Sequence, residues 1–280
     1  MIIMDMNQIS LASLMMDLNM RKSDEVREDL VRHMILNSIR MYRTEFQKEY
    51  GEIVLTYDSK HYWRREYFEY YKQNRKKGRE RDNKDWDSIF ECLNKIKSEF
   101  KEKLPYKFLE VYGAEADDII ATLCKTVKSE KILIVSGDKD FIQLQKYSNV
   151  KQYSPIQKKF INGFDPELYI KEHTLKGDTS DGIPNVLSPD NTFVDGLRQK
   201  PLGKKKIDNL ISMDIDNLHS EVKRNFQRNH TLINLDNIPN KLESEIIDTF
   251  NEAPCGDRSQ LLNYFIQSRL KELTESIGDF

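Results

Sequence analysis

Residues 132–140 read Ile-Leu-Ile-Val-Ser-Gly-Asp-Lys-Asp, so four apolar residues run almost directly into two aspartates, Asp138 and Asp140. A short continuous apolar run bounded by turn residues is typical of a strand that is buried on both faces of a parallel sheet. Similar runs occur at residues 2–4, 53–57 and 107–111. We therefore expect these four segments to form the strands of a parallel sheet.

The segments between these strands have the apolar spacing of helices. Residues 27–42, 87–100 and 116–127 each carry apolar side chains three or four positions apart. Strands that alternate with helices predict an α/β fold, in which a mostly parallel central sheet is flanked by helices.

The pattern changes after about residue 165, where helices and polar loops follow one another. Helices are expected at residues 207–211, 242–250 and 259–273, and the stretch at 185–206 is expected to be a loop because it is rich in Pro, Gly, Asn and Lys. The sequence thus predicts an α/β domain over residues 1–165 and a smaller helical domain over residues 166–280.

Composition narrows the kinds of site that the chain can carry. Charged residues make up 32% of the 280 residues with a net charge of −2, a balance that by itself points to neither nucleic acid nor membrane. The three cysteines form no C-x-x-C pair and the five histidines show no ligand spacing, so we expect neither group to bind metal. A reduced, cytosolic compartment is expected, because no signal peptide and no apolar run of about 20 residues is seen.

Aspartates follow three of the four expected strands. Asp5 follows residues 2–4, Asp58 follows residues 53–57, and Asp138 and Asp140 follow the run quoted above. Sites in open parallel sheets form at the carboxyl ends of the strands. The fold is therefore expected to bring these side chains into one pocket.

Two further acidic motifs lie at helix starts or in loops. Glu115-Ala-Asp-Asp118 opens the helix expected at residues 116–127, with Glu115 and Asp117 on the flanks of its apolar stripe and Asp118 pointing further away. Asp178 and Asp181 lie in Gly177-Asp-Thr-Ser-Asp-Gly182, where a helical turn would place them side by side. Each motif alone is better explained by a helix cap or an ordinary loop; their combination with the strand-end aspartates indicates a site.

Such crowding of carboxylates requires cations. Two bare charges about 4 Å apart repel by about 4 kcal/mol at an effective dielectric of about 20. Ligands that are all oxygen favour Mg²⁺ or Mn²⁺, and two such ions about 3.5–4 Å apart can stabilise phosphoryl transfer. Ca²⁺ is the rival ion, but the sequence has no EF-hand pattern.

A basic segment follows the second strand. Residues 60–81 carry nine basic and three acidic side chains, and on a helical wheel Lys72, Arg75, Lys76 and Arg79 share one face. The segment is expected to overhang the acidic pocket, so that a phosphate could bridge the ions below and these bases above. The interleaved aromatic residues form another face, and either core packing or stacking on unpaired bases would explain them.

These segments resemble the five-prime nuclease family of flap endonucleases and polymerase exonuclease domains, and most closely its T-even phage ribonuclease H branch. The resemblance covers almost the whole chain and is carried by Tyr57-Asp-Ser-Lys-His-Tyr-Trp-Arg-Arg65, Tyr70-Tyr-Lys-Gln-Asn-Arg75, Glu115-Ala-Asp-Asp-Ile119, Ser136-Gly-Asp-Lys-Asp-Phe-Ile-Gln-Leu144, Leu175-Lys-Gly-Asp-Thr-Ser-Asp181, Thr231-Leu-Ile-Asn-Leu-Asp-Asn-Ile-Pro239 and Leu273-Thr-Glu-Ser-Ile277. It implies a PIN-like five-prime nuclease fold with a basic helical arch near residues 60–100 and a helical DNA-binding domain over residues 166–280.

The resemblance implies a role for each matching residue. Ligands around a first metal ion, directly or through water, would be Asp5, Asp58, Glu115, Asp117 and Asp138, and the group of a second ion would be Asp140, Asp178 and Asp181. Lys72 and Arg75 match arch residues that contact the scissile phosphate. Contacts with nucleic acid are expected from Arg64, Arg65, Lys76 and Arg79, and from Lys204, Lys205 and Lys206 unless those three lie in a solvated loop.

The chain departs from the family pattern after Gly182-Ile-Pro-Asn-Val186. A polar stretch follows, where the family has a Gly-x-Gly-x-x-Thr-Ala helical hairpin that grips duplex DNA. We therefore expect this hairpin in an altered form, and the potassium site that accompanies it is not assured.

The implied activity is that of a five-prime to three-prime exonuclease and flap endonuclease with two Mg²⁺ ions, which Mn²⁺ could replace. Such an enzyme would cut branched or nicked DNA and RNA–DNA hybrids to leave a five-prime phosphate, and would clear primers and flaps from the lagging strand. It would act as a monomer with a single-strand DNA-binding protein and a sliding clamp, without a membrane, in the host cytoplasm if phage-encoded. One alternative is a flap-binding protein without catalysis. Another, a small RNA-cleaving nuclease, fits the length and the arch less well.

Overall fold

The computed structural model describes residues 1–213 and 218–280. Within these ranges the centre of the molecule is a six-stranded sheet with the strand order β3-β2-β1-β4-β5-β6. All neighbouring strands are parallel except β5 and β6. The strands are β1 (Ile2–Asp5), β2 (Ile53–Thr56), β3 (Lys107–Leu109), β4 (Ile132–Val135), β5 (Val150–Ser154) and β6 (Lys159–Ile161).

The expected α/β fold with a mostly parallel sheet is confirmed, and all four predicted strands are present. Strands β5 and β6 were not predicted, and they extend the sheet beyond β4. Strand β5 has no continuous apolar run, because the buried side chain of Gln152 occupies its middle and hydrogen-bonds to the carbonyl of Ser136 at 3.0 Å. Strand β6 is short and mostly exposed at the edge of the sheet.

The two faces of the sheet carry separate apolar cores. Ile2 and Met4 of β1 face a core that includes helices α1, α2 and α5, whereas Ile3 between them faces a core that includes α6 and α10. This alternation follows from the strand geometry, in which successive side chains point to opposite faces. Strands covered on both sides need apolar residues at every position, which explains the runs in the sequence.

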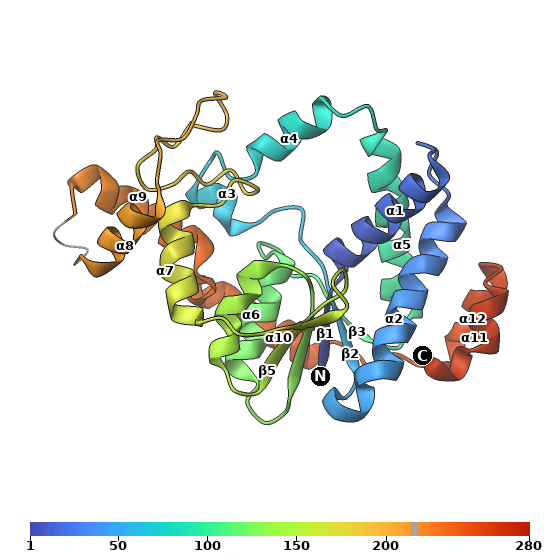
Figure 1. Ribbon diagram of the computed structural model, residues 1–280. Helices are drawn as coiled ribbons and strands as arrows, with labels where there is room; N and C mark the ends of the chain where they lie inside the picture. The colour runs from blue at the N-terminus through green and yellow to red at the C-terminus, as the bar shows by residue number, and fades with distance from the viewer. Residues whose placement is uncertain (214–217) are drawn as a thin grey trace.

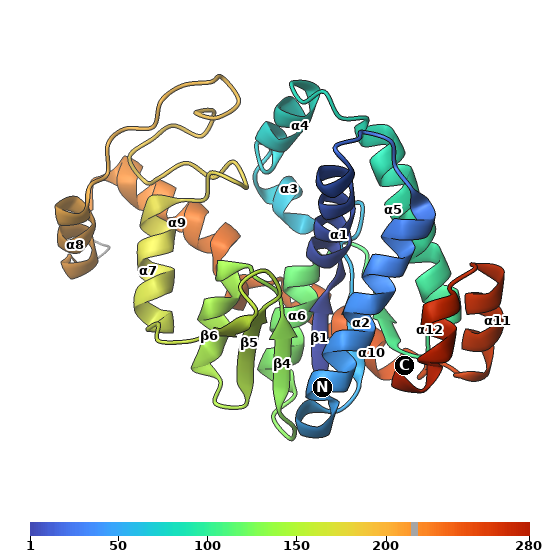
Figure 2. The same cartoon turned by 45° about the vertical axis from the view of Figure 1, so that its right-hand side comes forward.

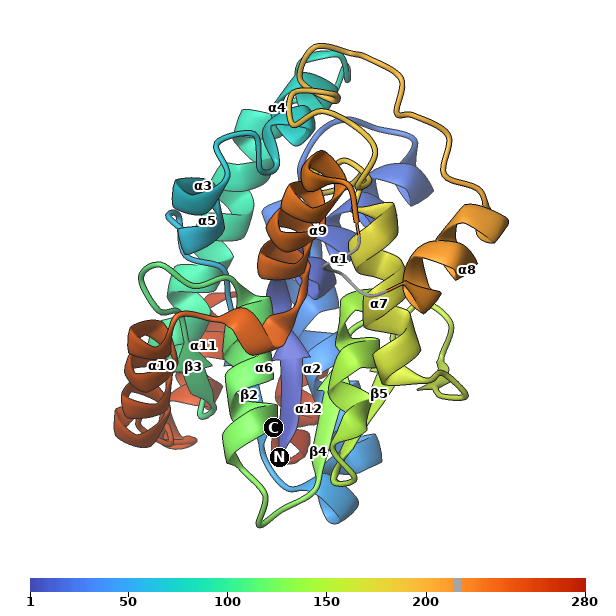
Figure 3. The same cartoon turned by 90° about the vertical axis from the view of Figure 1, so that its left-hand side faces the viewer.

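Helices cover both faces of this sheet (Figures 1 and 3). Those in the first half of the chain are α1 (Met6–Arg21), α2 (Glu28–Tyr50), α3 (Trp63–Tyr67), α4 (Gln73–Glu80), α5 (Trp86–Lys103), α6 (Ala116–Thr126) and the 3₁₀ helix η1 (Lys139–Lys146). Those in the second half are α7 (Pro166–Lys176), α8 (Lys204–Ser212), α9 (Ser220–Ile233), η3 (Leu235–Asn237), α10 (Asn240–Glu252), α11 (Ser259–Gln267), α12 (Lys271–Glu275) and η4 (Ile277–Asp279).

The predicted helices are present, with changes of extent. The helix expected at residues 27–42 continues to Tyr50 in α2. The helix expected at residues 259–273 is divided into α11 and α12, because Arg269 adopts a left-handed φ of 55° between them. The loop expected at residues 185–206 ends at Gly203, so Lys204, Lys205 and Lys206 form the first turn of α8.

Helices α1, α7 and α9 were not predicted, and the buried face of α9 shows why. That face combines the apolar Leu232 and Ile233 with polar side chains: Asn225 donates to the carbonyl of Val186 at 3.0 Å, and Asn229 donates to the carbonyl of Thr174 at 2.8 Å. Burial of these side chains is satisfied by hydrogen bonds instead of apolar contacts. The two asparagines thus interrupt the apolar stripe of α9, although the helix as a whole is amphipathic.

The carboxyl ends of β1, β2 and β4 point toward the end of the molecule at which α4 lies, and both chain termini lie toward the opposite end (Figure 2). Helix α4 bridges α3 and α5 above these strand ends in all three views. Among the residues that the structure describes, no helix has the length and apolarity to cross a membrane.

The second half of the chain packs back onto the first in several places. Helix α10 contacts α6 and β3, α11 contacts α5, and α7 contacts η1. The division into domains at residue 165 stays a prediction.

Truncation of Phe265 tests the packing of the C-terminal helices. This fully buried ring of α11 lies 5.0 Å from the ring of Phe280 in an edge-on contact. We expect Phe265→Ala to lower the free energy of unfolding by about 3–5 kcal/mol in urea titrations, because it leaves a cavity. Leu262→Ala, on the exposed side of the same helix, is the control and should change it by about 0.5 kcal/mol or less. Equal effects would show that α11 does not anchor the core.

Candidate metal centre

Seven of the eight predicted acidic residues line a single cavity of about 210 Å³ at the carboxyl ends of the strands. The cavity also includes the side chains of Lys72 and Arg75. Its carboxylates come from five separate parts of the chain and are Asp5, Asp58, Asp117, Asp138, Asp140, Asp178 and Asp181. The fold thus brings these acids together as the strand-end pattern predicted, whereas Glu115 lies behind the cavity.

Hydrogen bonds from neighbouring backbone and side-chain groups orient the strand-end aspartates. Asp5 caps α1 by accepting from the Gln8 amide at 3.1 Å, and its other oxygen accepts from the Ser136 hydroxyl at 3.1 Å. Asp58 accepts from the amide of Ala116 at 2.7 Å, which ties the end of β2 to the start of α6. Both oxygens of Asp5 are therefore held by donors, and one oxygen of Asp58 is held by the start of α6.

The loop that carries Asp178 and Asp181 depends on a glycine. Gly177 ends α7 with a φ of 68°, and a Cβ atom there would lie 2.4 Å from the carbonyl oxygen of Ile183. Only glycine accommodates both constraints. Asp178 then closes the turn by accepting from the amide of Ser180 at 2.7 Å and from that of Asp181 at 3.2 Å.

The carboxylates in the cavity are electrostatically strained. Burial, with the charge of Asp58 next, raises the pKa of Asp5 to about 7. Burial and the charge of Asp138 likewise raise the pKa of Asp140 to about 7. Burial and then Asp138 raise the pKa of Asp117 well above its ordinary value. Such a set of oxygen donors fits hard divalent cations, since a bound cation would stabilise the ionised forms.

Glu115 is held by cations of the protein itself. Its carboxylate is almost fully buried, pairs with Lys72, and accepts from Arg64 Nη1 at 2.9 Å. The Tyr71 hydroxyl lies 3.0 Å from it and 2.8 Å from Asp181 Oδ2. Burial alone would raise its pKa, but Lys72 and Arg64 outweigh burial and lower it. In this structure Glu115 therefore does not line the cavity. It holds Lys72, which does line the cavity, and the buried Arg64.

Arg64 was expected to contact nucleic acid, but the structure contradicts this expectation. Its side chain is buried, and its guanidinium pairs with Glu115 and Asp118 and donates to the carbonyl of Leu232 at 2.8 Å. A helical wheel could not show this, because the partners come from α6 and α9. Arg64 cannot reach a phosphate at the surface without abandoning these partners.

Lys72 and Arg75 lie at the cavity, as the arch prediction requires. Lys72 adopts a left-handed φ of 58° at the start of α4, and its amide donates to the carbonyl of Asp181 at 2.7 Å. Its ammonium nitrogen is 3.7 Å from Asp181 Oδ2. Arg75 pairs with Asp181 and donates through Nε to the carbonyl of Ser180 at 3.1 Å. The base of the arch is thus fastened to the loop that carries Asp178 and Asp181.

The remaining predicted cations are placed outside the cavity. Arg65 and Lys76 are exposed, and the half-buried Arg79 lies 5.4 Å from the centre of the Phe90 ring. Lys204, Lys205 and Lys206 are exposed at the start of α8, which lies beyond α7 (Figure 3). Among the aromatic residues of this segment, Phe68 and Tyr71 are buried in a core cluster, whereas Tyr67 is exposed.

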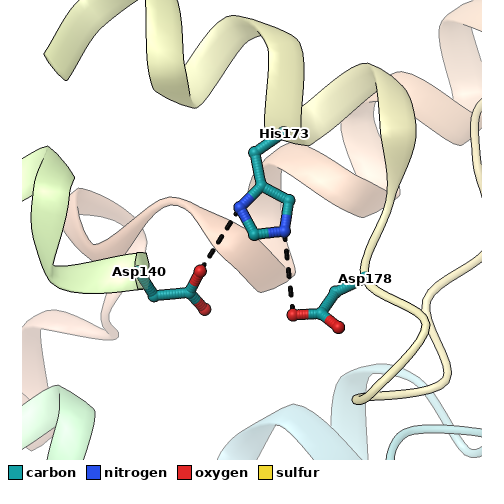
Figure 4. A group of neighbouring side chains, drawn as sticks. All are labelled: Asp140, His173 and Asp178. Atoms are coloured by element: carbon teal, nitrogen blue, oxygen red, sulfur yellow. Dashed lines mark ion pairs between the residues drawn. The ribbon is translucent and has the colours of Figure 1, made fainter. Parts of the chain in front are cut away.

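No histidine was expected to bind metal, but His173 lies between two of the cavity carboxylates (Figure 4). Its Nδ1 is 3.3 Å from Asp140 Oδ1, and its Nε2 is 3.7 Å from Asp178 Oδ2. Asp140, His173 and Asp178 can offer ligand atoms that all lie within 4.8 Å of one another. The sequence signal was weak, because His173 and Asp140 are far apart along the chain.

Two family models together span almost the whole chain. The model described as "5'-3' exonuclease, N-terminal resolvase-like domain" matches residues 3–173, and that described as "T4 RNase H, C terminal" matches residues 164–280. Ribonuclease H of Enterobacteria phage T4 is 36% identical over 294 residues, which cover 99% of this chain and 95% of that protein. A 5'-3' exonuclease of Buchnera aphidicola subsp. Schizaphis graminum is 35% identical over 147 residues, or 48% of each chain.

Solved structures of phage T5 proteins share the fold. A T5 protein co-crystallised with metal ions has a TM-score of 0.65 at 18% identity, with 89% of this chain and 98% of that chain covered. A T5 flap endonuclease in a pseudo-enzyme-product complex with DNA and metal ions has a TM-score of 0.64 at 17% identity, with 90% and 99% covered. At these identities the likeness concerns the fold alone.

Replacement of Arg64 tests its structural role. We expect Arg64→Met to lower the free energy of unfolding by about 3–5 kcal/mol, because Glu115 and Asp118 would be left buried without their shared cation. Arg65→Met is the matched control, and should cost about 1 kcal/mol or less, since Arg65 is exposed over the Tyr62 ring. Urea titrations of both variants decide the matter. A stable Arg64→Met protein with weakened DNA binding would restore the phosphate-contact interpretation.

The stability of the metal-free protein should fall as pH rises from about 4 to about 7. Asp5 and Asp140 have a pKa of about 7 in the fold against 3.8 ordinarily, so the folded chain retains protons in this window that the unfolded chain releases. Burial alone would raise the pKa of Asp178, but its hydrogen bond with His173 outweighs burial and lowers the pKa. This group therefore makes stability rise with pH, but only below about pH 4.

Urea titrations in chelator across this pH window measure the effect. Asp5→Asn should flatten the decline, and saturating Mg²⁺ should reverse it at the upper end of the window. A free energy of unfolding that rises with pH in the chelated protein would contradict the electrostatic strain described above.

Proposed function

Since this chain belongs to the 5'-3' exonuclease family and is a nuclease, we propose that it is a magnesium-dependent five-prime exonuclease and flap endonuclease. The observation that carries this proposal is the cavity in which seven carboxylates meet Lys72 and Arg75 at the ends of the central strands. The proposed substrates are branched or nicked DNA and RNA–DNA hybrids. The T4 relative is named ribonuclease H, and the T5 neighbour is a flap endonuclease in complex with DNA and metal ions.

The proposed metal ligands divide into two groups. Asp5, Asp58, Asp117 and Asp138 would hold a first Mg²⁺ ion, with Glu115 behind them fixing Lys72 and Arg64. A second ion would be held by Asp140, Asp178 and Asp181, and Mn²⁺ could replace Mg²⁺ at both. When bound, a pair of such ions supplies the positive charge that stabilises the attacking and leaving oxygens of a phosphodiester.

Lys72 and Arg75 are proposed to bind the scissile phosphate. Both already pair with Asp181 at the rim of the acidic cavity, so a phosphate that enters would exchange one anionic partner for another. Arg75 has 45% of its side chain exposed, and its guanidinium can turn toward a phosphate. Burial of Lys72 disfavours its charge, but Asp181 and Glu115 outweigh burial and raise its pKa, so it would meet the phosphate as a cation.

A second cavity lies beneath α4 and leads to the acids. It has a volume of about 570 Å³, shares Asp58 and Arg75 with the acidic cavity, and is bounded by residues of α1, α4 and α5 such as Ser10, Arg79 and Trp86. Its mixture of polar and aromatic side chains suits an unpaired nucleic-acid strand. We propose that the unpaired five-prime end of a substrate passes here, and that Arg65, Lys76 and Arg79 contact its phosphates.

The same proposal extends to the setting of the activity. We infer removal of RNA primers and flaps from the lagging strand, by a monomer in the cytoplasm of a host cell. The helical part at residues 166–280, with Lys204, Lys205 and Lys206, would bind the duplex, and a single-strand DNA-binding protein and a sliding clamp would be its partners. A protein that only binds flaps is the alternative, but binding an anionic substrate gains nothing from seven adjacent carboxylates.

Asp138→Asn tests the proposed chemistry. The substitution removes one charge from the cavity while preserving the size of the side chain, so we expect cleavage to fall by at least about a hundredfold, since even outer-layer partners of a metal are worth about 10–100-fold. DNA affinity should stay within about threefold. The measurement uses end-labelled flap, nicked and RNA–DNA substrates in a magnesium titration.

Asp248→Asn, at an exposed position of α10, is the matched control and should cleave like the unaltered protein. Undiminished turnover by Asp138→Asn would refute the assignment of the site. Binding of flaps by the unaltered protein without cleavage at any magnesium concentration would favour the binding-only alternative.

A further inference from the structure

His173 occupies a fixed position between two separate parts of the acidic site. It lies in the last turns of α7, where its ring packs edge-on against Tyr169 at 5.4 Å. The carbonyl of His173 accepts from the amide of Gly177 at 2.8 Å, and that turn directs the chain back so that Asp178 faces the imidazole. Asp140 approaches from the other side on η1 (Figure 4).

The imidazole is partly buried, and one of its nitrogens lacks a hydrogen-bond partner. Its side chain is 16% exposed, and Nδ1 has no hydrogen-bond partner of good geometry although Asp140 Oδ1 is 3.3 Å away. A buried nitrogen of this kind usually has a partner in proteins. The lone pair of Nδ1 is therefore available to bind an atom from outside the protein chain, such as a metal ion.

Solvent reaches the imidazole by a route that is separate from the arch. A cavity of about 440 Å³ lies on the α7 side of the acids and is lined by Asp138, Asp140, Tyr169, His173 and Asp178, among others. Asp138, Asp140 and Asp178 border both this cavity and the acidic one. A hydrated cation could thus reach His173 without passing beneath α4.

We propose that His173 is a nitrogen ligand of the ion held by Asp140 and Asp178, which makes this position a mixed carboxylate–imidazole site that prefers Mn²⁺ or Co²⁺ to Mg²⁺. One ring nitrogen would bind the ion, and Asp140 and Asp178, which flank the ring, would supply carboxylate oxygens to the same ion. Imidazole nitrogen raises affinity for transition-metal ions, whereas Mg²⁺ prefers oxygen ligands. The inference rests on the proposed function, because it concerns one of the two proposed metal positions.

The competing explanation is purely structural. A protonated His173 would serve as an internal cation that separates Asp140 from Asp178, without binding an ion. A glutamine at this position can still donate a hydrogen bond to either carboxylate, but it offers an amide oxygen in place of a nitrogen. The two explanations therefore differ in what His173→Gln does to ions of different kinds.

The test is calorimetric titration of Mg²⁺, Mn²⁺ and Co²⁺ into the metal-free full-length protein without substrate, with visible absorption spectra of the Co²⁺ form. We expect His173→Gln to weaken Mn²⁺ and Co²⁺ binding at one position by about tenfold or more and to shift the Co²⁺ bands, with little change for Mg²⁺. His33→Gln is the control, since this histidine of α2 lies 3.8 Å from the single carboxylate of Glu272. His173→Asn and thermal melts of each variant separate loss of the ligand from loss of the fold.

Each result decides a different statement. Unchanged Co²⁺ affinity and spectrum in folded His173→Gln and His173→Asn would overturn the nitrogen ligand and leave the proposed nuclease intact. Equal weakening for Mg²⁺ and Co²⁺ would also overturn it, in favour of the structural explanation. An unaltered protein that takes up none of the three ions would refute the proposed metal-dependent function together with this inference.

Discussion

Mutual repulsion among carboxylates at the ends of β1, β2 and β4 is the constraint around which this molecule is organised. Seven acidic side chains share a cavity of about 210 Å³, and burial raises the pKa of Asp5 and of Asp140 to about 7. The parallel sheet concentrates these charges because its carboxyl ends meet at one edge. The surrounding elements compensate them with backbone amides, with two cations of the arch and, as proposed, with metal ions.

A second layer links this cavity to the arch and to the C-terminal half. Glu115 pairs with Arg64 and Lys72, and the Tyr71 hydroxyl lies between Glu115 and Asp181. These contacts join α6, the base of the arch and the turn after α7 in one buried network. The positions of Lys72 and Arg75 are therefore coupled to the acids, and neither group can shift without loss of ion pairs from the other.

Local sequence predicted most of the elements whose buried faces are apolar, although α1, with Ile9, Leu14 and Leu18 in the core, was missed. The runs of β1, β2, β3 and β4 and the stripes of α2, α5 and α6 were recognised because both faces of the sheet exclude water. Elements with polar buried faces were missed: Gln152 lies in the middle of β5, and Asn225 and Asn229 face inward from α9. Their burial depends on hydrogen-bond partners from distant segments, which periodicity along the chain does not reveal.

The sequence by itself determined the α/β class, the position of four strands along the chain and the convergence of the strand-end aspartates, because each follows from local apolar runs and the geometry of parallel sheets. Only the tertiary structure decided which charges turn inward. Arg64 and Arg65 are neighbours in the sequence, yet one is buried against Glu115 and Asp118 and the other is exposed. His173 meets Asp140 only because α7 packs on η1. Such pairings depend on how helices and strands pack against one another, and the spacing of residues along the chain does not predict them.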